Sequence, residues 1–261
     1  MAMSFIISST SDEVGTKKAG VTTASIRAIR GGHDDVVVIN DAPSMAQALN
    51  EGVRRAKHDR LCIVHNDVEL RPSQYWSDDV LEVIRRRFRV GFLGAAGSKD
   101  AFPDGKWYVE GNRMSGAVIH GQFYAPNQQA PNGARALADG RRYAEWVTTY
   151  GDFGRVVLLD GVVLMTSKQV LEEIGGFDES RYPEAFHYYD LDATLRAHLA
   201  GYHNITLPLM VRHLSLGTYD DKWALARERF LEKWDARLPV MVSEGDGENY
   251  TIEALRNLKV A

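Results

Sequence analysis

Two carboxylates and a distant histidine are the side chains of this sequence best suited to hold a divalent cation. Asp67 and Glu69 are separated by one residue, so both can reach one ion from a loop. Hard cations such as Mg²⁺ prefer oxygen ligands and often keep substrate phosphate oxygens in their shell. Histidine is a common ligand for Mn²⁺, and His213 follows an apolar, strand-like segment. On its own each pattern also fits a structural role, with Asp67 capping a turn and Glu69 facing solvent.

An acidic residue among aromatic side chains is a candidate general base. Asp190 follows the run Phe186-His187-Tyr188-Tyr189 at the beginning of an expected helix. Acids at a helix N-terminus are favoured by capping and by the helix dipole, which is a sufficient structural explanation. A carboxylate held there can also accept the proton of an attacking hydroxyl group. The neighbouring aromatic residues with polar tips would suit a sugar ring.

Strand-like and helix-like patterns alternate along the first 98 residues. We expect strands at 5–7, 36–39, 61–64 and 90–93, and helices at 22–30, 44–56 and 75–88. This alternation is typical of βαβ units and a mostly parallel sheet. Because ligands bind at the carboxyl ends of the strands in such sheets, the polar residues after the strands are candidate ligand contacts. They are Ser8, Ser9, Thr10, Asn40, Asp41 and Asn66.

The second half of the sequence begins with a segment of different character. Residues 99–154 are rich in Gly, Pro, Asn and aromatic residues, and we expect them to be irregular, with a hairpin near 117–123 and a mobile loop at 126–140. Regular patterns then predict strands at 156–159, 162–165 and 205–211, the last interrupted by Pro208. Helices are expected at 167–174, 191–199 and 223–234, followed by a loosely attached tail.

The composition excludes several classes of protein. The 261 residues are 44% hydrophobic and 25% charged with a net charge of -4, which lacks the basic excess of a nucleic-acid-binding protein. The single cysteine, Cys62, excludes a disulfide framework and a cysteine-based zinc site. No apolar stretch approaches the ~20 residues that span a bilayer, and the N-terminus does not resemble a signal peptide. We therefore expect a cytoplasmic protein, with peripheral membrane contact as an open alternative.

Four segments, taken in order, resemble the GT-A nucleotide-sugar glycosyltransferases, specifically their family-2-like inverting group. They are residues 44–52, 65–72, 160–179 and 189–213, and the turn Gly175-Gly176-Phe177-Asp178 is the most specific part. The resemblance extends from residue 5 to about residue 217 and is weakest over 99–154. Two positions depart from the pattern. Asn66 stands where many members carry an acid, and Tyr189-Asp190 replaces the usual Glu-Asp pair.

The resemblance implies an α/β fold of the GT-A type, with a Rossmann-like, mostly parallel sheet flanked by helices and an irregular acceptor-side insertion. Residues 1–98 would form the nucleotide-binding half and 99–217 the acceptor and base half, with 218–261 packed on the same domain. The implied activity is metal-dependent transfer of a hexosyl or deoxyhexosyl group from a nucleotide-sugar donor. The acceptor would be a hydroxyl group of a glycan or glycoconjugate, and configuration would invert in a single displacement.

The same resemblance assigns roles to particular residues. Asp190 would be the catalytic base, and Asp67 and His213, with Glu69 as a further candidate, would hold Mn²⁺ or Mg²⁺. The acceptor would contact Trp107, His187 and Tyr188. The nucleotide sugar would contact Ser8, Ser9, Thr10, Asn40, Asp41, Ala46, Asn50, Asn66, Asp160 and Gly161.

Two other functions are compatible with parts of the pattern. A nucleotidyltransferase that makes activated sugars has a similar fold, but it usually carries a Gly-rich loop with Arg and Lys after the first strand. Residues 8–20 contain Gly15, Lys17 and Lys18 without that Gly-rich pattern. The other alternative is a non-catalytic, carbohydrate-binding relative that kept the fold.

Overall fold

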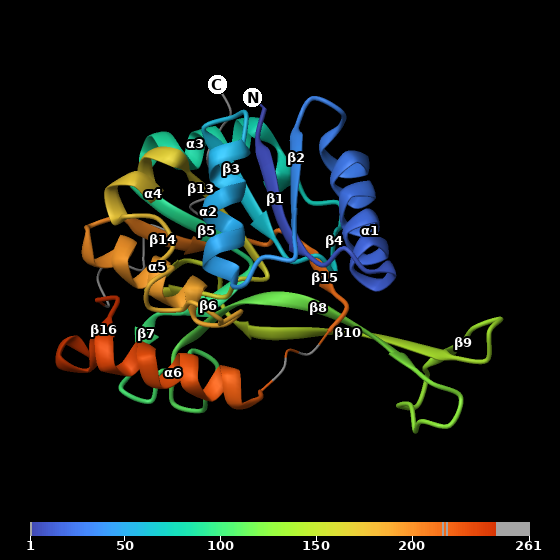
Figure 1. The fold of residues 1–261 in the computed structure, drawn as a ribbon. Helices are drawn as coiled ribbons and strands as arrows, with labels where there is room; N and C mark the ends of the chain where they lie inside the picture. The colour runs from blue at the N-terminus through green and yellow to red at the C-terminus, as the bar shows by residue number, and fades with distance from the viewer. Residues whose placement is uncertain (1, 216, 218, 244–261) are drawn as a thin grey trace.

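Buried apolar runs form the central sheet of the protein. In the computed structural model, which describes residues 2–215, 217 and 219–243, this sheet has seven strands in the order β11-β14-β5-β13-β3-β1-β2 (Figure 1). The strands β1, β2, β3, β5 and β14 share one direction, whereas β13 and β11 run antiparallel to their neighbours. Their bounds are β1 (Ser4–Ser9), β2 (Asp35–Asn40), β3 (Arg60–Val64), β5 (Val90–Gly94), β11 (Arg155–Val156), β13 (Val163–Ser167) and β14 (His203–Thr206).

Helices cover both faces of this sheet. Alternate residues of β1 point to opposite faces, so Phe5 packs in one hydrophobic cluster with Ile26 of α1, and Ile6 packs in another with Leu49 of α2. The expected α/β architecture is confirmed. The helices are α1 (Glu13–Arg30), α2 (Met45–Arg55), α3 (Asp78–Arg87), α4 (Lys168–Ile174), α5 (Tyr189–Leu199) and α6 (Asp221–Trp234), with short 3₁₀ turns η1 (Gln74–Trp76) and η2 (Asp235–Arg237).

Two predicted helices differ from the observed ones. Helix α1 begins at Glu13 rather than residue 22, because the side chain of Asp12 accepts a hydrogen bond from the backbone N–H of Gly15 at 2.6 Å. Its first turns bury small residues such as Gly15 and Ala19, which produce no apolar periodicity. The helix predicted at 75–88 is divided, because Ser77 adopts an extended conformation between η1 and α3.

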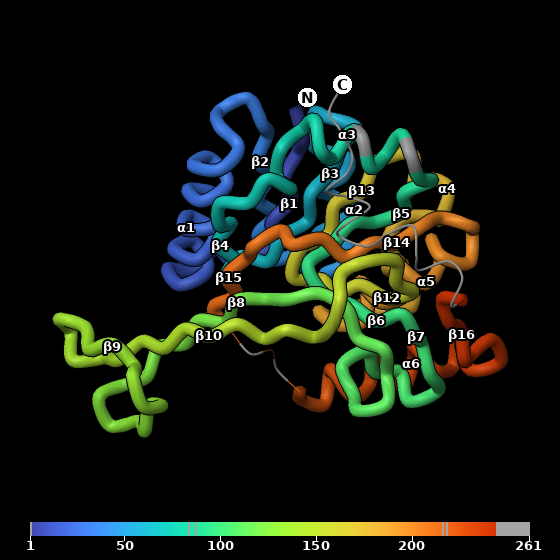
Figure 2. Tube along the Cα trace, turned by 180° about the vertical axis from the view of Figure 1, so that it is seen from behind, coloured from blue at the N-terminus to red at the C-terminus, as the bar shows by residue number. Residues whose placement is uncertain are grey.

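The prediction that residues 99–154 are irregular was wrong for residues 114–124 and 142–151, which form long strands. A second sheet has the order β12-β6-β8-β10-β9, and its strands β8 and β10 form a long antiparallel ribbon that projects from the body (Figure 2). The expected hairpin at 117–123 lies within a single strand. Both faces of the ribbon carry a mixture of polar and aromatic residues, so the sequence does not show the alternation of apolar and polar residues that is typical of a strand. The bounds are β6 (Ala96–Ser98), β8 (Met114–Tyr124), β9 (Arg135–Ala136), β10 (Arg142–Gly151) and β12 (Leu158–Leu159).

The strand predicted at 205–211 is two strands in different sheets. Strand β14 ends at Thr206, and β15 (Val211–His213) begins after Pro208 and after Met210, whose φ is 52°. Strand β15 then pairs with β4 (Val68–Leu70) and with β8. The chain therefore crosses from the central sheet to the second sheet just before His213.

The C-terminal helix packs on the rest of the protein. Phe230 and Trp234 of α6 are buried, and the indole N–H of Trp234 donates to Asp192 of α5 at 2.9 Å. A small antiparallel pair joins β16 (Val240–Met241) to β7 (Asp100–Ala101). Within the described ranges, none of the helices combines the length and the apolar character needed to cross a bilayer. The tail that we expected to be loosely attached begins after Leu238. Its first residues include β16, which pairs with β7, and residues 244–261 lie outside the described part of the chain.

Candidate active site

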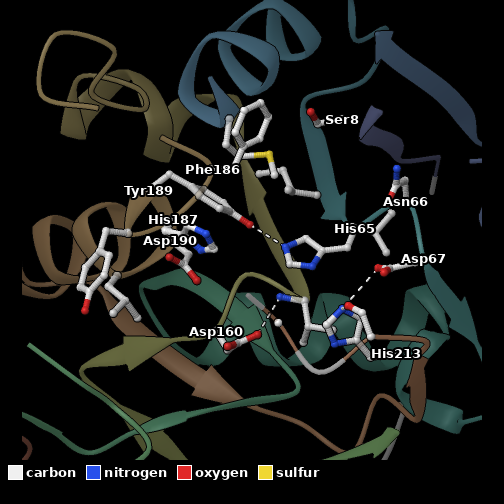
Figure 3. Close-up of a pocket in the computed structure, with 18 of the residues that line it drawn as sticks. Ser8, His65, Asn66, Asp67, Asp160, Phe186, His187, Tyr189, Asp190 and His213 are labelled. Carbon is white, nitrogen blue, oxygen red and sulfur yellow. Dashed lines mark hydrogen bonds and ion pairs between the residues drawn. The ribbon is translucent and has the colours of Figure 1, made fainter. Parts of the chain in front are cut away.

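A cleft of about 670 Å³ opens where β1 and β3 end, between the central sheet and the second sheet. Its walls come from segments far apart in the sequence (Figure 3). It contains most of the predicted site residues, which the sequence alone could not place together. Those that line it are Ser8, Ser9, Thr10, Asp41, Asn66, Asp67, Trp107, Asp160, His187, Tyr188, Asp190 and His213.

One end of the cleft holds a group of three possible metal ligands. One ligand atom each from His65, Asp67 and His213 lies within 4.8 Å of the others. The antiparallel pairing of β4 with β15 places His213 opposite Val68, and the backbone N–H of Leu214 donates to the carbonyl of Asp67 at 3.0 Å. Strand pairing thus explains why the predicted ligands Asp67 and His213 meet.

Sequence reasoning did not identify His65 as a ligand. The only available signal is its position two residues before Asp67, at the end of β3. Its Nε2 atom lies 2.9 Å from the hydroxyl oxygen of Tyr189. The other ring nitrogen faces the side of the cleft that holds Asp67 and His213 (Figure 3).

Burial and neighbouring charges shift the pKa values of Asp67 and His65 in this group. Burial alone would raise the pKa of Asp67, but the hydrogen bond and charge of His213, with His65 and Lys18, hold the pKa well below its usual range. Burial lowers the pKa of His65, and the charge of His213 adds to this effect. An ionised carboxylate and a neutral imidazole are the forms that bind metals. Two imidazoles and one carboxylate are therefore a donor set that could hold a divalent metal ion.

Asp190 occupies the wall of the cleft at the beginning of α5. Its Oδ2 atom accepts a hydrogen bond from the backbone N–H of Gly161 at 2.7 Å. Burial raises the pKa of Asp190 to about 7, and the charge of Asp160 acts in the same direction. The backbone N–H groups of Leu191 and Gly161 oppose this shift. A carboxylate with a pKa near neutrality is well matched to general base catalysis.

Glu69 requires a correction, because it does not join the metal-ligand group. Its carboxylate pairs with the guanidinium of Arg212 in β15, and the same guanidinium contacts Glu145 of the ribbon at 3.0 Å. Residues alternate in direction along a strand, so Glu69 in β4 points away from the face that Val68 presents. The carboxylate stabilises the junction between β4, β15 and β10.

Four predicted donor contacts also lie outside the lining of the cleft. Asn40 is exposed at the end of β2, and Ala46 is fully buried in α2. The amide of Asn50 donates to the carbonyl of Phe177 at 2.8 Å and accepts from the N–H of the same residue at 3.0 Å, so it fixes the turn after α4. Gly161 contributes its N–H to Asp190 and does not itself line the cleft.

Several lining residues had no predicted role. Lys18 extends from α1 to within 3.7 Å of Asp67, because the helix begins at Glu13 and not at the expected residue 22. Lys106, Tyr150 and Tyr219 also line the cleft. Tyr150 packs against Trp107 with ring centroids 5.0 Å apart, which forms an aromatic wall beside the acceptor candidates.

Comparisons with known proteins identify the family of this chain. Residues 4–235 match the family described as "Glycosyltransferase like family". The uncharacterized protein y4gI of Sinorhizobium fredii (strain NBRC 101917 / NGR234) is 27% identical over 184 residues, which are 69% of this chain and 18% of that protein. This chain therefore spans less than a fifth of that relative.

A solved structure also aligns with this chain. It is the mannosyltransferase PcManGT from Pyrobaculum calidifontis in complex with GDP-Man and Mn²⁺, with a TM-score of 0.45 and 11% identity over 84% of this chain and 58% of that one. The resemblance recognised in the sequence is confirmed by the family match, which covers nearly the whole chain. On this basis, the protein belongs to the glycosyltransferase-like family.

Proposed function

We propose that the protein transfers a sugar from a nucleotide-sugar donor to a hydroxyl acceptor, with inversion and with a divalent cation. The observation that carries this proposal is that one cleft contains both a His65, Asp67 and His213 cluster and a carboxyl group, Asp190, whose pKa is raised to about 7. A cation-binding cluster suits a diphosphate, and a near-neutral carboxylate suits a hydroxyl proton. In the proposed transfer, the sugar moves from the diphosphate to the hydroxyl oxygen, so the cation cluster and Asp190 would act on the two ends of the same reaction.

The cation would be held by His65, Asp67 and His213. When bound, it would neutralise the charge that develops on the leaving diphosphate. Lys18, whose side chain is 46% exposed and already near Asp67, is placed to contact the same phosphate groups. The predicted contacts to the nucleotide would come from Ser8, Ser9, Thr10, Asp41 and Asn66, which line the adjacent wall.

Asp190 would act as the base. As the acceptor oxygen attacks the anomeric carbon, its proton moves to Asp190 and the bond from that carbon to the diphosphate oxygen breaks. The N–H of Gly161 fixes the carboxylate during this step. Attack from the face opposite the leaving group inverts the configuration. Trp107, His187 and Tyr188, together with Asp160, would position the two sugars.

A thermal-shift screen tests this proposal directly. The full chain is heated with each nucleoside diphosphate, with and without Mn²⁺, and one nucleotide should raise Tm only when the cation is present. Stabilisation follows RT ln(1 + [L]/Kd), so a ligand at 100 times its Kd adds about 2.7 kcal/mol. Absence of any Mn²⁺-dependent shift would contradict the proposal. Release of pyrophosphate from a sugar phosphate and a nucleoside triphosphate would instead favour a nucleotidyltransferase.

The proposal also covers the donor sugar, the acceptor and the location of the protein. They are a hexosyl or deoxyhexosyl donor, a glycan or glycoconjugate acceptor and a cytoplasmic location. We also propose that the chain divides near residue 98 into a donor half and an acceptor half.

A further inference from the structure

A row of aromatic rings leads out of the cleft onto the projecting ribbon. The rings of His65 and His213 have centroids 5.4 Å apart, His213 and His120 are 6.4 Å apart, and His120 and Trp146 are 5.7 Å apart and stacked. His120 lines the cleft, whereas Trp146 lies just beyond its lining. The row therefore connects the candidate metal cluster with the surface of β8 and β10.

The strand register extends this row along one face of the ribbon. His120 lies directly opposite Trp146, and Gln122 lies opposite Ala144. Residues two apart in a strand share a face, so Tyr124 continues the same face, where its hydroxyl donates to Gln122 at 2.9 Å. We call His120, Gln122, Tyr124, Ala144 and Trp146 the ribbon track. From His120 to Tyr124 it extends about 13 Å at ~3.3 Å per residue.

The opposite face of the ribbon carries contacts between neighbouring strands of the second sheet, and Phe123 and Val147 on it are exposed. Arg212 donates to the hydroxyl of Tyr143 at 3.0 Å and pairs with Glu145. The hydroxyl of Tyr143 covers Gly121, where an added Cβ would lie 2.4 Å from it and 2.9 Å from Leu214. His120 lines the cleft, so the face that carries it, the ribbon track, continues the wall of the cleft.

We infer that the ribbon track binds an extended glycan acceptor, whose terminal sugar enters the cleft while the preceding sugars lie along β8 and β10. This inference rests on the proposed glycosyltransferase function and adds the position of the acceptor and its extended form to it. An aromatic ring beside hydroxyl and amide groups is the surface that sugar rings require, with an apolar face for stacking and polar groups for hydroxyls. The length of the track accommodates more than one sugar ring.

The ribbon track is continuous with the cleft, which favours an extended glycan as its ligand. A glycan that donates its terminal hydroxyl near Asp190 must leave the cleft along one of its walls, and the row of rings forms such a wall. The track is neither strongly charged nor purely apolar, so it lacks the chemistry of a membrane-binding surface. The exposed apolar residues Val147, at 61%, and Phe123, at 45%, lie on the opposite ribbon face.

Two adjacent residues of β10 provide a matched test, because Trp146 lies on the track and Val147 faces the other way. Affinities of the full chain are measured by calorimetry for mono-, tri- and hexasaccharides of glucose, mannose and N-acetylglucosamine, with Mn²⁺ and a nucleoside diphosphate present. Wild-type affinity should increase with chain length for at least one series. Trp146→Ala should weaken hexasaccharide binding by about tenfold or more, whereas Val147→Ala should not.

Separate outcomes distinguish failure of this inference from failure of the proposed function. Three results would overturn the inference that the ribbon track binds a glycan. They are an affinity that does not grow with chain length, no hexasaccharide binding at all, and equal affinity in wild type and Trp146→Ala. Binding to phosphatidylglycerol vesicles that Val147→Ala abolishes, without any length dependence, assigns the ribbon to membranes instead and also overturns it. The Mn²⁺-dependent nucleotide shift is recorded on the same variants. If the shift persists in these variants, the proposed donor site is unaffected. If the shift is absent from wild type, the proposed function itself is contradicted.

Discussion

The hydroxyl of Tyr189 lies 2.9 Å from Nε2 of His65 and 3.4 Å from the carbonyl oxygen of Gly161. With Nε2 protonated, His65 donates to Tyr189, and Tyr189 donates to Gly161. This arrangement leaves the Nδ1 lone pair of His65 free for a cation. Asp190 follows Tyr189 directly in the chain, so one tyrosine connects the candidate metal cluster to the candidate base.

Removing that hydroxyl should weaken cation binding. Such partners orient ligating histidines, and their loss typically costs 10–100-fold in metal affinity. We expect Tyr189→Phe to raise the Kd for Mn²⁺ by about this factor, measured by titration calorimetry. Tyr150→Phe is the control, because Tyr150 lines the same cleft and its ring packs against Trp107. Equal Mn²⁺ affinity in both variants would show that the contact does not orient the imidazole.

Substitution of the proposed metal ligands and of Glu69 should have different effects on the Mn²⁺-dependent increase in Tm. Asp67→Asn and His213→Ala should abolish the Mn²⁺-dependent increase in Tm. Glu69→Gln should keep that increase but lower the free energy of unfolding by about 1–3 kcal/mol, because Arg212 loses a charged hydrogen-bond partner. Loss of Mn²⁺ binding in Glu69→Gln would restore Glu69 to the ligand set.

The base assignment predicts both a rate loss and a pH profile. Asp190→Asn keeps an oxygen to accept from Gly161, so donor binding should persist while transfer falls by roughly 10²–10⁴-fold. Since burial raises the pKa of Asp190 to about 7, the carboxylate form grows as pH rises through neutrality. Wild-type kcat/KM should therefore rise with pH and level off above about 7. A transfer rate near wild type in Asp190→Asn would falsify the assignment.

The same pKa shift predicts a pH-dependent cost in stability. Because the pKa of Asp190 is raised from 3.8 to about 7, the folded protein binds more protons than the unfolded chain between these values. The contribution of Asp190 to the free energy of unfolding therefore falls as pH rises through this window. At about pH 8, Asp190→Asn should exceed wild type in Tm by at least ~2–4 °C. The gain should shrink toward about pH 4, and a gain that is independent of pH would exclude this explanation.

Gly161 should not tolerate a side chain. A Cβ there would lie 2.1 Å from the hydroxyl of Tyr189 and 3.0 Å from Oδ2 of Asp190. Gly161→Ala should cost about 1–3 kcal/mol of stability through overpacking and should lower transfer by displacing both groups. Gly20→Ala is the matched control, because nothing lies within 4 Å of its added Cβ. That control should gain ~0.8–1 kcal/mol from improved helix propensity, and equal behaviour of the two variants would contradict the steric argument.

Local sequence patterns were enough to predict much of the fold. The apolar runs of β1, β2, β3 and β5 and the helices α2 and α4 appear where we expected them. These features depend on neighbours within a few residues, which a sequence displays directly. Where the local signal was weak, prediction failed. The small buried residues of α1 and the mixed faces of the β8–β10 ribbon show no clear period.

The contents of the site depended on pairings between distant segments. The sequence alone determined that strand ends would carry polar residues and that Asp67, Asp190 and His213 were candidates for chemistry. Only the tertiary structure decided that β15 lies beside β4, which brings His213 to Asp67 and Arg212 to Glu69. It also placed His65 in the ligand group and committed Asn50 to a turn. The physical reason is that a side chain's role follows from the partner that reaches it, and those partners are separated from it by much of the chain.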